Sequence, residues 1–132
     1  MTKFDISKNT GVWFDMEGGG RVKLRTLPVS DLKRINKATI TKTPFVHVVD
    51  GREKVLTHEV VDDDRWTSMV NDCCIVDWEN LFDKDGNKIE CNADNKDILM
   101  CMEDDTFREF VKEKLAVLSD HEKKEQEAAE KN

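Results

Sequence analysis

The sequence predicts an α+β fold, with β-hairpin elements in the N-terminal half followed by a mainly helical C-terminal half. Three observations predict it: turn sequences flanked by β-prone residues before residue 61, a short hairpin pattern around residues 75–91, and an apolar stripe at helical spacing after residue 104. At 132 residues the chain suits one compact domain. We expect that domain at 11–118, between a loosely ordered arm at 1–10 and a charged tail at 119–132 that is either helical or disordered.

The N-terminal half contains two predicted hairpins. Residues 12–16 lead into Glu-Gly-Gly-Gly, and residues 21–25 then alternate polar and apolar side chains. The glycines favour a turn over a phosphate-binding loop, because a strand pattern follows them instead of a helix start. Ser30 is the expected N-cap of a short helix through Asn36. A second hairpin is predicted within 39–61, around the Asp50-Gly51 turn.

The second half begins with a predicted amphipathic helix that follows the acidic triplet at 62–64. In the next run, strand alternation puts Val76 and Trp78 on one face and Asp77 on the other. A further helix is expected to start at Asn92 or Asp94. The clearest helix starts near residue 104 and carries an apolar stripe of Phe107, Phe110, Val111, Leu115 and Leu118.

The formal charge of −7 argues against a nucleic-acid partner, although residues 21–42 are locally basic. No window approaches the 18 to 20 or so apolar residues of a membrane span, and the N-terminus lacks the apolar core of a signal peptide. We therefore expect no membrane association, a cytoplasmic location, and cysteines that remain free thiols.

No motif in the sequence predicts catalysis, a metal or a cofactor. Asp83, Asp85 and Asn87 resemble the first ligands of a calcium loop, but Lys88 stands where that loop needs glycine, so a plain turn is favoured. The four cysteines lack the Cys-x-x-Cys pairing of structural zinc sites. We expect a protein that is not an enzyme.

Residues 75–99 carry a family resemblance. The segment reads Ile-Val-Asp-Trp-Glu-Asn-Leu, then Asp-Lys-Asp-Gly-Asn-Lys-Ile-Glu-Cys, then a helix start at Asn95-Lys96. It resembles tail assembly chaperones of long-tailed (siphovirus-type) bacteriophages and prophages, as do the Gly-Val-Trp-Phe opening at 11–14 and the charged tail. Cys91 stands where relatives commonly carry Pro-Phe or Pro-Tyr, and residues 39–61 have no counterpart.

The resemblance implies a protein of the host bacterial cytoplasm that binds the tape measure protein and assists assembly of the tail tube protein around it. Such proteins are absent from the mature virion and are made in a short form and a frameshifted longer form. The alternative is a small structural tail component, such as a tail completion or connector protein. Self-association is also open. The candidate protein-binding residues, which equally suit a core, are Trp78, Phe107, Phe110, Val111 and Leu115.

Overall fold

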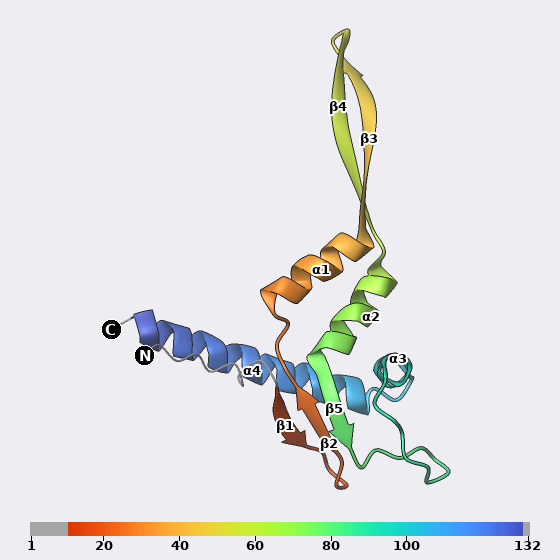
Figure 1. Ribbon diagram of the computed structural model, residues 1–132, viewed down its shortest axis with the longest axis vertical. Helices are drawn as coiled ribbons and strands as arrows, with labels where there is room; N and C mark the ends of the chain where they lie inside the picture. The colour runs from red at the N-terminus through yellow and green to blue at the C-terminus, as the bar shows by residue number, and fades with distance from the viewer. Residues whose placement is uncertain (1–10, 131–132) are drawn as a thin grey trace, which may run out of the picture.

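The computed structural model describes residues 11–130, with side chains through residue 124, and confirms the α+β class. The described part of the chain forms a small body of three strands and four helices, from which one long β-hairpin projects along the longest axis (Figure 1). The predicted arm at 1–10 and the last two residues of the predicted tail lie outside the described residues.

A three-stranded antiparallel sheet organises the body. Its strands are β1 (Val12–Asp15), β2 (Arg21–Leu24) and β5 (Ile75–Glu79), in the order β1-β2-β5. The predicted first hairpin is confirmed, and the amide of Met16 closes its turn by donating to the carbonyl of Gly20 at 2.7 Å. The sheet thus joins the first hairpin to a strand that begins about fifty positions after β2 ends.

A β-bulge changes which residues of β5 face the core. Leu24 pairs with Ile75 whereas Lys23 pairs with Asp77, so Val76 is an extra residue on β5. Ile75 and Trp78 therefore share the buried face, and Val76 is exposed. The predicted pairing of Val76 and Trp78 on one face is wrong, because strict alternation does not continue through a bulge.

Two packed helices support the long hairpin. α1 (Val29–Thr39) leads into β3 (Ile40–Val49), and β4 (Arg52–Val61) leads back into α2 (Asp63–Cys74). The Trp66 indole donates to the Asn36 side chain at 2.9 Å and joins the two helices. The N-cap of α1 is Pro28 and not Ser30 as predicted, since proline at 28 already sets the extended backbone that precedes the helix.

The predicted short hairpin around residues 75–91 is present only in reduced form. A single antiparallel bridge joins Phe82 and Lys88 across the turn, while the preceding strand pairs with β2 instead. α3 (Ala93–Cys101) then starts at the N-cap Asn92, one of the two predicted caps. α4 (Thr106–Glu130) extends the predicted helix through most of the charged tail.

The core lies between the sheet, α3 and α4. It consists of apolar residues from each of these elements, namely Val22, Leu24, Ile75, Trp78, Met100, Phe107 and Val111. α4 crosses the sheet, so its apolar stripe covers one face while its remaining surface stays in solvent (Figure 1). Lys96 is also buried, and its ammonium donates to the Asp72 carboxylate at 2.9 Å and the Asp72 carbonyl at 3.2 Å.

Candidate functional site

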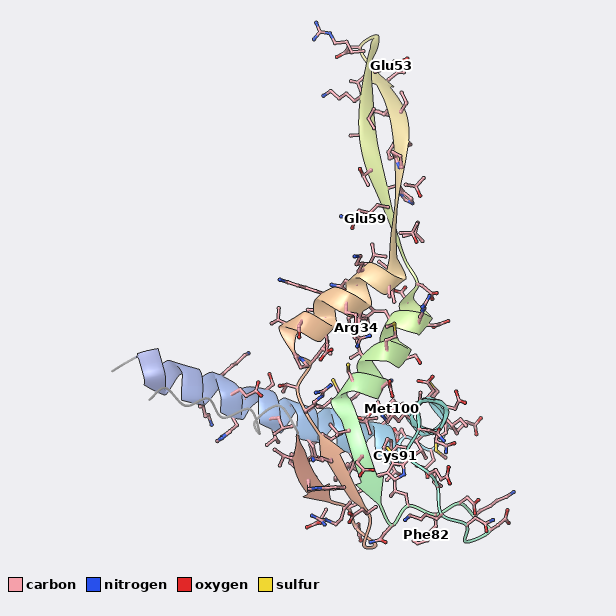
Figure 2. All side chains as sticks on the ribbon, viewed as in Figure 1. Arg34, Glu53, Glu59, Phe82, Cys91 and Met100 are labelled. Atoms are coloured by element: carbon pink, nitrogen blue, oxygen red, sulfur yellow. The ribbon has the colours of Figure 1, made fainter. Side chains whose placement is uncertain are left out.

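The predicted hairpin within residues 39–61 is confirmed, and it is almost fully exposed. Its strands hold ten residues each, and every one except Ile40 is exposed. Asp50 and Gly51 form the turn with φ of 53° and 75°, which is the two-residue type I′ geometry that suits a right-twisted hairpin. Figure 2 shows side chains standing free on both sides of this hairpin, with Glu53 near the tip and Glu59 closer to the helices.

Both faces of the long hairpin are apolar in the middle. Val46 pairs with Val55 on one face, where the two side chains are 60% and 73% exposed. Phe45 pairs with Leu56 on the other face, where they are 42% and 41% exposed. Exposed apolar pairs on both faces make this hairpin a candidate interaction site, because large exposed apolar areas are uncommon on monomeric proteins.

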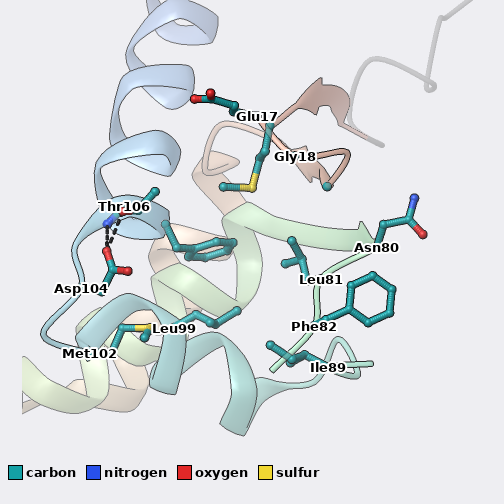
Figure 3. A pocket seen from close by; sticks show the side chains of 13 residues that line it. Glu17, Gly18, Asn80, Leu81, Phe82, Ile89, Leu99, Met102, Asp104 and Thr106 are labelled. Atoms are coloured by element: carbon teal, nitrogen blue, oxygen red, sulfur yellow. Dashed lines mark hydrogen bonds between the residues drawn. The ribbon is translucent and has the colours of Figure 1, made fainter. Parts of the chain in front are cut away.

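A second candidate site is an open pocket of about 270 Å³ at the opposite end of the body (Figure 3). Three segments that are distant in sequence line it: the β1–β2 turn, residues 80–89, and the end of α3 with the start of α4. The lining is mainly apolar, and we name the apolar pocket surface by the residues Leu81, Phe82, Ile89, Ile98, Leu99 and Met102. Ile98 belongs to a neighbouring hollow that shares Ile89 and Leu99 with the pocket.

The rim of the pocket combines exposed apolar groups with negative charge. Phe82 and Met102 are 57% and 40% exposed, and Ile98 in the neighbouring hollow is 61% exposed. The Asp104 carboxylate accepts hydrogen bonds from the hydroxyl and the amide of Thr106, at 2.6 Å and 3.0 Å. These bonds lower the pKa of Asp104, so this carboxyl stays ionised beside the pocket. An apolar partner with basic flanking residues would fit this chemistry.

The glycine-rich turn shapes one wall of the pocket. Gly18 and Gly19 adopt φ of 95° and 96°, which L-residues with side chains rarely adopt. A Cβ on Gly20 would lie 2.8 Å from Cδ2 of Leu81, so glycine at this position lets residues 80–81 approach the turn. The predicted turn role of the three glycines is confirmed, with a packing role added at the third.

The predicted protein-binding residues lie in or against the core. Trp78, Phe107 and Val111 are only 4%, 6% and 1% exposed, and Phe110 and Leu115 pack against the same cluster. The Trp78 indole donates to the Ile89 carbonyl at 2.8 Å, and its ring meets that of Phe107 edge to face at 5.9 Å. The core interpretation of these side chains therefore fits the structure, and only Phe107 also lines the pocket.

The residues considered for a calcium site form a turn, and among the cysteines considered for a zinc site Cys74 is buried. The Asp83 carboxylate accepts hydrogen bonds from the amides of Asp85 and Asn87, both at 2.9 Å, as a turn requires. Across residues 11–124, no three or more His, Cys, Asp or Glu side chains are grouped so as to hold a metal ion. Burial raises the pKa of the Cys74 thiol to about 11 and also raises that of Cys91, which keeps both in the less reactive thiol form.

Acidic partners offset much of the locally basic run at 21–42. Arg21 pairs with Asp15 at 3.1 Å and with Glu79 at 3.4 Å. Lys42 pairs with Glu59 at 3.5 Å across the long hairpin. These pairs reduce the positive potential that a phosphate backbone would need.

Comparisons of the chain with protein-family models, with curated proteins and with solved structures find no match. Among the described helices, none combines the length and the apolar character needed to cross a bilayer.

Sequence reasoning missed the pocket because its walls come from three separate segments. No local signal marked it, because Phe82 follows Leu81 and Ile98 precedes Leu99, so each looks like part of an ordinary apolar run. The full exposure of the long hairpin was missed for a related reason: apolar residues at both odd and even positions usually indicate a strand buried on both faces.

Proposed function

We propose that this protein is a tail assembly chaperone of a long-tailed bacteriophage, which acts in the host bacterial cytoplasm and holds the tape measure protein while the tail tube protein assembles. The observation that carries the proposal is the open apolar pocket. Most of its apolar surface comes from residues 81–99, which belong to the segment that resembles this family.

The pocket suits transient binding of an amphipathic helix. Helix-in-groove recognition needs a few apolar anchors to enter a preformed hollow. Phe82 and Met102 present an exposed apolar surface around the pocket, and Ile98 extends that surface into the neighbouring hollow. A pocket of about 270 Å³ admits one or two side chains and not a whole helix. Binding through so few anchors stays weak enough for the tape measure protein, the client of this chaperone, to leave as the tail tube forms.

Co-expression with the adjacent tape measure protein tests this function. We expect the soluble fraction of the tape measure protein to rise with the wild-type chain and to fall back with Ile98→Glu, which places a charge in the apolar pocket surface. Val117→Glu is the matched control, because Val117 is also an exposed helical residue, at 52% against 61%, but lies away from the pocket.

Two results would contradict the proposal. A tape measure protein that is equally soluble without this chain would remove the chaperone function. Equal loss of solubility with Ile98→Glu and Val117→Glu would remove the apolar pocket surface as the binding site. Circular dichroism of both variants controls for unfolding.

A small structural tail component remains the second candidate, and the long hairpin is the observation that favours it. Exposed two-stranded hairpins can add strands to neighbouring subunits in a permanent assembly. Quantitative mass spectrometry of purified virions separates the candidates, since abundant copies in the particle would support the structural component and contradict the chaperone.

A further inference from the structure

The long hairpin has a defined pattern of paired and unpaired backbone groups. Val49 and Arg52 close a two-residue turn, so they form a hydrogen-bonded pair, and such pairs alternate along an antiparallel ladder. The amide of Asp62 donates to the carbonyl of Thr39 at 2.9 Å, which gives the same alternation at the other end. Even-numbered residues of β3 and odd-numbered residues of β4 therefore direct their backbone groups outward.

The two outer edges of the long hairpin differ. Pro44 occupies an outward position of β3, where its missing N–H interrupts the edge. The outer edge of β4 has no proline. It offers five consecutive outward positions, each with a donor and an acceptor: Glu53, Val55, Thr57, Glu59 and Val61. A strand can thus add along the whole of β4 but not along the whole of β3.

These five positions are symmetric about Thr57. If a second β4 lies antiparallel with Thr57 on the two-fold axis, every outward position has an outward partner, because Glu53 meets Val61 and Val55 meets Glu59. The same register puts Arg52 of one copy opposite Asp62 of the other, twice across the interface. Few unrelated strands would offer this combination of full pairing and opposite charge.

Charge also favours a second copy. The chain carries −7, but within residues 40–61 Lys42, Arg52 and Lys54 balance Asp50, Glu53 and Glu59. Two long hairpins can therefore lie together without net repulsion, while the acidic bodies sit at opposite ends of a strand pair that spans roughly 34 Å. The apolar residues on each face would then form wider patches.

We propose that two copies of this chain associate through the outer edge of β4, forming a four-stranded antiparallel ribbon with Thr57 on its two-fold axis. Pro44 lies on each outer edge of that ribbon and stops further strands from adding, so the assembly closes as a dimer. The proposal is independent of the client site, since association state and client solubility are separate measurements.

Sedimentation equilibrium of the full chain tests the association. We expect a mass near twice the 15.3 kDa of one chain, with Val55→Pro weakening association at least about tenfold through two lost hydrogen bonds per dimer. Val46→Pro is the matched control, because Val46 is the direct cross-strand partner of Val55 and faces outward on β3. A monomeric wild type, or equal effects of the two prolines, would overturn the proposal.

A cysteine at the predicted axis tests the register. In a Cys101→Ser background, which removes the exposed native thiol, Thr57→Cys should give a covalent dimer on mild oxidation. Hydrogen-bonded antiparallel pairs place their Cα atoms about 5.5 Å apart, within disulfide range. Thr43→Cys, the same change at an exposed residue of β3, should stay monomeric on a non-reducing gel. Equal crosslinking of the two variants would refute this register.

Discussion

Replacement of Trp78 by phenylalanine should destabilise the body and loosen the wall of the pocket. The change removes the indole N–H that donates to the Ile89 carbonyl at 2.8 Å, in a side chain that is only 4% exposed. The carbonyl of Ile89 loses this donor, and a small cavity remains because phenyl is smaller than indole. The expected cost is roughly 2–3 kcal/mol, of which about half comes from the unpaired carbonyl and half from the cavity.

Thermal unfolding followed by circular dichroism measures this cost. For a domain of this size the melting temperature should fall by roughly 8–12 °C. Trp13→Phe is the control with the same chemistry, because Trp13 is only partly buried and packs under the side chains of Arg21 and Lys23, at 4.9 Å and 5.9 Å from its ring centre. It should cost about 0.5–1 kcal/mol. An equal loss in the two variants would refute the role assigned to the Trp78–Ile89 hydrogen bond.

Three further predictions concern the helix start, the turn and the thiols. Asp62→Ala removes the side chain that accepts from the amide of Arg65 and should cost about 1 kcal/mol in urea unfolding, whereas Asp63→Ala should cost less. Gly51→Val strains a turn residue at φ 75° and should speed amide exchange in the long hairpin while leaving the body unchanged. The pKa of Cys74 is about 11 in the folded protein against 9.0 in the unfolded chain. The contribution of this thiol to stability is therefore complete below pH 9 and declines as the pH rises toward 11. Cys74→Ala should flatten that decline when the melting temperature is measured against pH.

Much of the fold follows from local sequence chemistry. Asp50-Gly51 predicts a tight hairpin because both residues must adopt positive φ, and they do. Asn92 predicts a helix start because its side chain can accept from the amide of Asn95, as it does at 2.8 Å. The stripe from Phe107 to Leu118 predicts a helix because 3.6-residue spacing gathers these side chains on one face.

The features that sequence reasoning missed depend on contacts between distant segments. The bulge at Val76 arises from the pairing of β5 with β2, which local alternation cannot reveal. The binding role of Phe107, Phe110, Val111 and Leu115 stays a prediction, because it rests on an apolar stripe and a stripe alone does not distinguish a core from an interface. Similarly, Phe45 and Val46 indicate a strand, but neighbouring apolar residues do not reveal whether anything covers it.

The hydrogen bond between Trp66 and Asn36 lies at the base of the long hairpin. It links the two helices that carry the strands outward, and those strands span roughly 34 Å beyond it. A rotation of about 10° between the helices and the strands would therefore swing the far turn by roughly 6 Å. Small adjustments in how α1 and α2 pack within the body would therefore move the position at which Asp50 and Gly51 are presented.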